Sequence, residues 1–189
     1  MTWLITPGLI ETLFDNHLLS NPIFIKAAIN GSQSDAAAMS RLMQKALATK
    51  NPQIIADTIL EMGRQDIQHQ AFQWIPLVRS FGKSVNLAIA QALGLLSCNG
   101  FEMTLRELIT HTDQQVASAA AESLGKKGSL ADLLALRASS AAALSEIGYR
   151  NTAQTAISQI LERISHNTSS AHDLRPHQIP QQIDKTHTA

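Results

Sequence analysis

The sequence predicts an all-α protein, an α-solenoid in which antiparallel helix pairs stack into a superhelix. Two observations support this class. Glycines recur at a nearly constant step along the chain, at Gly31, Gly63, Gly94 and Gly125. Aromatic residues make up only 4% of the chain, and alanine and leucine fill the apolar quota instead. Such residues, which are small or lack branching at Cβ, favour closely packed helices over a β-sandwich.

The first predicted element is an N-terminal capping helix within residues 1–21. Thr6 can cap it, and Pro7 suits a first helical turn, where the missing N–H costs no hydrogen bond. The apolar residues that follow keep the three-to-four spacing of one helical face. They are Leu9, Ile10, Leu13 and Phe14.

Residues 22–165 carry a repeat of about 31 residues. Each copy predicts a first helix, a turn near the glycine and a second helix. We expect each glycine to close its first helix in a left-handed conformation. Pro76 should kink the second helix of its copy or mark its start. The same step relates the triplets Ile54, Val85 and Val116 in the first helices and Trp74, Leu105 and Leu136 in the second.

Both ends of the repeat domain depart from this step. A weaker copy precedes the regular ones and ends at Gly31. The last copy is compressed, because Gly148 follows Gly125 sooner than the regular step would place it, and we expect its second helix at about 152–164. Terminal repeats are commonly atypical, so this copy is predicted to cap the stack. Residues 166–189 are polar and hold two prolines, which predicts a disordered tail.

The segments Val85–Leu96 and Val116–Gly128 resemble HEAT-like repeats of the phycobilisome-lyase type. That family's pattern has an apolar residue, small residues, Leu-Gly and a turn, often with an aspartate shortly before the first valine, where Asp113 stands. The arginine that often follows the valine is replaced by Asn86 and Ser118. The resemblance implies a solenoid of antiparallel helix pairs, and it covers about residues 52–165.

Charge and hydropathy argue against nucleic-acid binding and membrane insertion. The chain has 15 basic and 15 acidic residues, and no segment forms a basic stripe. Nucleic-acid binding is therefore disfavoured, since phosphate neutralisation supplies much of that affinity. Membrane insertion is not expected either, because there is no long apolar run.

Cys98 is the single cysteine, which fits a reducing compartment, and we expect the protein in the cytoplasm.

Motifs for chemistry are missing from the sequence. The seven histidines form no HExxH pattern, and one cysteine cannot form a CxxC pair. Cys98 has no base placed beside it by spacing. Asp57, Glu61 and Asp66 are expected on a solvated face, with the bilin site implied by the resemblance as the minor alternative. We therefore predict no catalytic, cofactor-binding or metal-binding residues.

The predicted function is a non-catalytic scaffold or adaptor that binds another protein through the solenoid surface. Trp74 is expected in the core, whereas Phe72 and Trp3 are freer to contact a partner. Two alternatives remain: a bilin lyase-like factor acting on chromophore proteins, and a HEAT-like nucleic-acid-binding protein. The candidate partner-binding residues all lie in predicted second helices: Gln70, Gln73, Arg79, Arg106, Glu107 and Arg137.

Overall fold

The computed structural model describes residues 21–32, 35–143 and 146–172, and within them every regular element is a helix. The expected all-α class is confirmed. The elements are α2 (Pro22–Ser32), α3 (Ala36–Ala48), α4 (Pro52–Arg64), the 3-10 helix η2 (Gln68–Gln70), α5 (Ala71–Trp74), the 3-10 helix η3 (Ile75–Arg79), α6 (Lys83–Leu95), α7 (Glu102–Leu108), α8 (Gln114–Lys127), α9 (Leu130–Ala142) and α10 (Ile147–His172).

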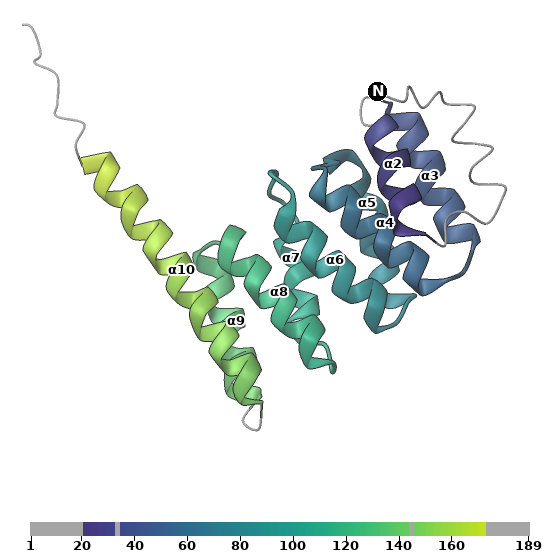
Figure 1. The fold of residues 1–189 in the computed structure, drawn as a ribbon. Coiled ribbons are helices and arrows are strands. Elements are labelled where there is room, and N and C mark those ends of the chain that lie inside the picture. Colours follow the sequence, from purple (N-terminus) through teal and green to yellow (C-terminus); the bar gives the residue numbers. More distant parts are fainter. Residues whose placement is uncertain (1–20, 33–34, 144–145, 173–189) are drawn as a thin grey trace, which may run out of the picture.

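The helices form an extended row from α2 to α10 (Figure 1). The first helices of successive repeats pack on one another, so that α6 contacts α4 on one side and α8 on the other, and α8 contacts α10. Among the second helices, α7 contacts α9. Each apolar face is thus buried against the neighbouring repeats, and one hydrophobic core runs through the described helices.

The repeat glycines have a different role from the predicted one. Gly63, Gly94 and Gly125 lie inside α4, α6 and α8, and the only described glycine with a positive φ is Gly100. Their hydrogen side chains instead allow the next helix to approach closely. A Cβ at Gly63 would lie 2.6 Å from the Cβ of Ala92 in α6. The expectation of left-handed helix ends at these glycines is therefore wrong.

Capping residues show where the first copy begins. Asn21 accepts a hydrogen bond from the Ile23 N–H (2.9 Å), and Asn51 accepts one from the Gln53 N–H (3.0 Å). Each asparagine is followed by a proline in the first helical turn, where proline is tolerated. The two caps are therefore equivalent points of the first and second copies, and the exposed Gly31 is not equivalent to the buried Gly63.

The last copy is also built differently from the prediction. A single helix, α10, runs from Ile147 to His172, so Gly148 lies in its first turn and no separate helix starts near residue 152. The helix continues past the predicted domain boundary at residue 165. The predicted N-terminal helix (except Asn21) and the rest of the predicted tail, 173–189, lie outside the described residues.

Pro76 interrupts the second helix of its repeat, as expected. The α-helical part, α5, ends at Trp74, and Pro76 lies in the first turn of the 3-10 helix η3 that follows. The backbone at this point cannot continue an α-helical ladder because proline has no N–H to donate. Trp74 itself is fully buried, which confirms its predicted place in the core.

Candidate protein-interaction surface

The six predicted partner-binding residues do not form one free surface. Gln70 is 2% exposed, and its Oε1 atom has no hydrogen-bond partner among the described residues. The Nε2 atom of Gln73 lies 3.3 Å from the Ser40 Oγ atom of α3, to which it donates. Neither glutamine therefore presents its amide to solvent for a partner. The four charged residues lie farther along the second helices.

Arg106 is held by a carboxylate from the next repeat. Its Nε atom donates to Oδ1 of Asp132 in α9 at 2.5 Å. Asp132 is fully buried and also accepts from the N–H and the hydroxyl of Ser129, which makes it part of the capping box of α9. Burial alone would raise the pKa of Asp132, but the hydrogen bonds from Arg106 and Ser129 hold it below its ordinary value. Arg106 thus ties α7 to α9.

Arg79 and Glu107 form a second link between repeats. The Arg79 Nε atom lies 3.0 Å from Glu107 Oε1, and their side chains are 82% and 45% exposed. An ion pair this exposed contributes little to stability, about 0–1 kcal/mol. Both residues remain accessible to a partner. Arg137 in α9 is exposed and makes no ion pair with any described residue.

Large apolar side chains are exposed on the same second helices. Phe72 in α5, Met103 in α7 and Leu134 in α9 are 69%, 79% and 73% exposed. Successive members are separated by one full repeat step, so the three occupy the same position of the repeat. We call them the apolar ladder. They lie two residues before the core positions Trp74, Leu105 and Leu136, which places them on the opposite, solvent-facing side of each helix.

Sequence reasoning found only one member of the ladder, Phe72. Met103 and Leu134 were missed, although the repeat step from Phe72 points to both. The first helices lack such a feature at their own solvent-facing repeat position. There, Gln91 in α6 and Glu122 in α8 are exposed polar residues, and Leu60 in α4 is half-buried. The apolar ladder therefore distinguishes the second-helix side of the molecule.

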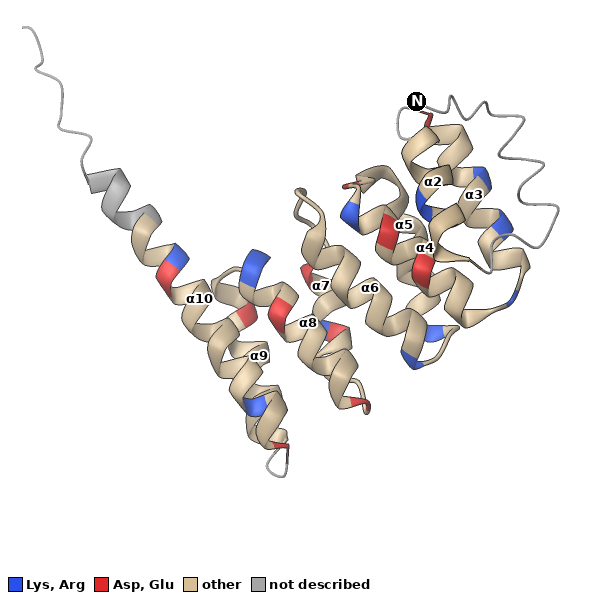
Figure 2. Ribbon diagram, in the orientation of Figure 1, with Lys and Arg blue, Asp and Glu red and all other residues tan. Residues whose placement is uncertain are grey.

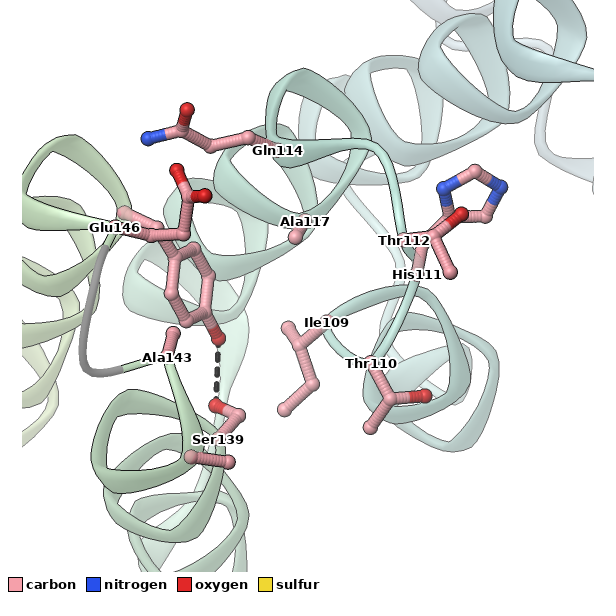
Figure 3. Close-up of a pocket in the computed structure, with 11 residues that line it drawn as sticks. Ile109, Thr110, His111, Thr112, Gln114, Ala117, Ser139, Ala143 and Glu146 are labelled. Atoms are coloured by element: carbon pink, nitrogen blue, oxygen red, sulfur yellow. Dashed lines mark hydrogen bonds between the residues drawn. The ribbon is translucent and has the colours of Figure 1, made fainter.

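A cavity of about 300 Å³ lies where the loop before α8 faces the end of α9 and the start of α10 (Figure 3). Two of its polar side chains, Tyr149 and His111, already have partners. The Tyr149 hydroxyl lies 2.5 Å from Ser139 Oγ, and His111 Nδ1 accepts from the Asp113 N–H at 2.9 Å. Burial raises the pKa of Tyr149, so the phenol stays neutral at physiological pH. Glu146 and His111 lie on opposite sides, and the lining residues include no nucleophile paired with a base.

Glu61 is only 6% exposed, so its expected place on a solvated face is wrong, and its carboxylate accepts hydrogen bonds from the nearby Arg64 and Gln65. Asp66 and Cys98 take part in links between repeats. The Asp66 carboxylate accepts from the N–H of Ser97 at 2.7 Å and from its hydroxyl at 2.5 Å. These bonds lower the pKa of Asp66. The Lys127 Nζ atom donates to the carbonyl of Cys98 at 2.9 Å. In the described segments, no three histidine, cysteine or acidic residues gather in a group that could hold a metal ion.

Charged residues are dispersed along the described helices, with acidic and basic positions interspersed from α2 to α10 (Figure 2). None of these helices is both long enough and apolar enough to cross a membrane. No family model, no curated protein and no solved structure matches the chain.

Proposed function

We propose that this protein is a non-catalytic scaffold that binds another protein with the solvent side of α5, α7 and α9. The observation that carries the proposal is the apolar ladder. Its three members repeat at one position of successive helix pairs, which distinguishes them from scattered exposed side chains. Isolated exposed apolar residues are ordinary, but a contiguous apolar patch rimmed by polar groups is typical of an interaction site.

Contacts around the ladder support a binding role. The Phe72 ring packs on Phe101, with ring centroids 5.2 Å apart and an angle of 59° between the rings. This contact fixes the exposed aromatic side chain, so less conformational entropy is lost when a partner covers it. Arg79, in η3 after α5, and Glu107, in α7, provide a polar rim. An aromatic anchor beside arginines has the composition of an interface hot spot.

Stacked helix pairs of the HEAT-like type suit such a role, because repeats placed side by side present one position of the repeat as a continuous surface. Under this proposal the described helices are such a solenoid, and the second helices form its binding side. The exposed groups of this surface suit recognition, since they are apolar side chains, the Arg79–Glu107 ion pair and Arg137.

A photo-crosslinking experiment tests the proposal. A benzophenone amino acid replaces Met103 in the full chain, and the matched control carries it at Gln91 on the first-helix side. Irradiation in an extract of the native host should give a discrete adduct with another protein from position 103 and none from position 91. Adducts that are identical from both positions, or lacking from position 103, would remove the ladder as the binding surface.

A further inference from the structure

The dipeptide Asn-Gly occurs twice in the sequence, at 30–31 and at 99–100. In both copies the asparagine and the glycine are exposed to solvent. An asparagine in this setting can lose its side-chain amide without an enzyme, because the backbone nitrogen of the next residue can attack the side-chain carbonyl carbon. Glycine obstructs that approach least, since it has no Cβ. The fold places the two copies in different backbone environments, which makes them a matched pair.

The first copy lies inside a helix. Asn30 and Gly31 belong to α2, which runs from Pro22 to Ser32. The helix fixes the backbone dihedral angle of Asn30 that must rotate before the side-chain carbon can reach the Gly31 nitrogen. The N–H of Gly31 also belongs to the hydrogen-bond ladder of the helix. Attack at this copy therefore requires local opening of α2.

The second copy lies between two helices. Asn99 and Gly100 follow the end of α6 and precede the start of α7. The Asn99 side chain makes no hydrogen bond with any described residue, so its rotation toward the Gly100 nitrogen breaks no such contact. Gly100 has a φ of 109°, and apart from its chain neighbours no atom lies within 4 Å of a Cβ built on it. The space around the attacking nitrogen is therefore open.

A carboxylate contacts the proton that this attack must remove. The Gly100 N–H donates to both carboxylate oxygens of Glu102, with N···O distances of 3.1 and 3.2 Å. A backbone amide is a poor nucleophile until it loses this proton, and a carboxylate within hydrogen-bond reach has the geometry of a general base. Glu102 lies in the first turn of α7, so the helix holds it in place. The corresponding residue after Gly31 is Gln33, which cannot take a proton in this way.

From these observations we propose that Asn99 is a site of spontaneous deamidation, with Glu102 as the base. The Gly100 nitrogen forms a bond to Cγ of Asn99, and the bond from Cγ to the side-chain amide nitrogen breaks. The proton that Glu102 takes from Gly100 passes to the departing nitrogen, which leaves as ammonia. The cyclic succinimide that remains is opened by water at either carbonyl, which gives aspartate or isoaspartate at position 99.

Both products change the approach to α7. Each adds a negative charge, and isoaspartate also lengthens the backbone by one carbon. On one side of the site the Cys98 carbonyl accepts a hydrogen bond from Lys127 Nζ at 2.9 Å, and on the other side Phe101 holds the ring of Phe72. Isoaspartate would thus be inserted between a link to the next repeat and the support of the apolar ladder. The reaction itself needs only this chain and water, so it does not depend on the proposed scaffold function.

Ageing of the purified full chain in mildly alkaline buffer tests the proposal by peptide mass spectrometry. The peptide with Asn99 should gain the mass difference between an amide and an acid at least about tenfold faster than the peptide with Asn30, because α2 must open before attack. An isoaspartyl methyltransferase should label the aged protein, and Asn99→Gln should remove most of that label. Deamidation at Asn99 that is no faster than at Asn30 would overturn the proposal.

Unfolding separates the effect of the fold from that of the dipeptide. In guanidinium chloride the two Asn-Gly copies should react at rates within about twofold of each other, since neither backbone is then held in a helix. This result would show that the folded structure causes the difference in the native chain. A tenfold difference that persisted in the denaturant would assign it to the neighbouring residues and contradict the structural argument.

The variant Glu102→Gln tests the base. Its amide oxygen can still accept from the Gly100 N–H but cannot take the proton, so deamidation of Asn99 in the folded chain should slow by at least about threefold. The matched control Glu122→Gln, on an exposed residue of α8, should leave the rate unchanged. Circular dichroism verifies that both variants are folded. An unchanged or faster rate in Glu102→Gln, or equal slowing in both variants, would overturn the role of Glu102.

Discussion

Replacing Gly94 with alanine gives the sharpest test of how the repeats pack. In an exposed helix this change would stabilise the protein by about 1 kcal/mol, because alanine has the higher helix propensity. In α6, however, the new Cβ would lie 2.8 Å from the Cβ of Ser123 in α8 and closer still to its hydroxyl oxygen. Heavy atoms cannot remain so close, so Ser123 or the whole of α8 must move.

The magnitude follows from three contributions. Overpacking a tight core contact costs about 1–3 kcal/mol. Moving Ser123 also breaks its hydrogen bond to the Ala90 carbonyl, which is 2.7 Å long and worth about 1 kcal/mol. The higher helix propensity of alanine offsets about 1 kcal/mol of this loss. We therefore expect Gly94→Ala to lower the free energy of unfolding by about 2 kcal/mol and the Tm by about 4–8 °C.

A double-mutant cycle with Ser123→Gly provides the control. The single change Ser123→Gly should cost about 1.5 kcal/mol through the lost hydrogen bond and the lower helix propensity of glycine. In the double variant the alanine at position 94 no longer meets a side chain at 123, and its higher helix propensity offsets about 1 kcal/mol, so the total loss should be about 0.5 kcal/mol rather than the sum of about 3.5 kcal/mol. Urea unfolding followed by circular dichroism measures all four proteins. Additive losses, or a Gly94→Ala protein as stable as the wild type, would refute close approach at Gly94.

Three other predictions concern links and surfaces that the structure defines. Asp132→Asn should lower the free energy of unfolding at pH 7 by about 1–3 kcal/mol. Because the pKa of Asp132 is below its ordinary 3.8 in the folded state, its contribution is present above that pH and lost as the pH falls through the folded pKa, so the variant should show a weaker loss of stability in acid titrations. Arg163→Ala removes donors to the carbonyls of Gly125, Lys126 and Gly128 at the end of α8 and should cost about 1–2 kcal/mol in urea unfolding, while Lys126→Ala, on an exposed side chain, should cost less than about 0.5 kcal/mol. Met103→Asp should change the free energy of unfolding by less than about 0.5 kcal/mol, and a larger loss would place Met103 in the core.

Tertiary packing decided the roles of residues that the sequence had marked only by position. The regular glycines were visible as a period, but a period does not distinguish a left-handed helix end from a close helix contact. Both need a residue without a Cβ, and only the position of Ala92 or Ser123 across the interface separates the two cases. For the same reason the role of the glycine in the last copy was predicted wrongly. Gly148 was expected to end a helix, but it lies in the first turn of α10.

The candidate surface, too, could be predicted only in part from the sequence. The charged residues of the second helices could be named from the sequence, but their pairing across repeats could not. Arg106 reaches a carboxylate in the following repeat, and the depth of Asp132 in the core depends on the packing of α7 on α9. As a result, Arg106→Glu would destabilise the fold as well as weaken any interface. A substitution of Arg137 would test the interface without breaking an ion pair between described residues.

The sequence alone determined the helical class, the length of the repeat and the positions that alternate between core and solvent, because these depend on local periodicity and on residue size. The repeat step also contained the apolar ladder, which becomes visible once the exposure of Phe72 is known. The tertiary structure decided which arginine has a carboxylate and which does not, since ion pairing depends on distances between segments far apart in the chain. It also decided the depth of Asp132 in the core, since that depends on the packing of α7 on α9.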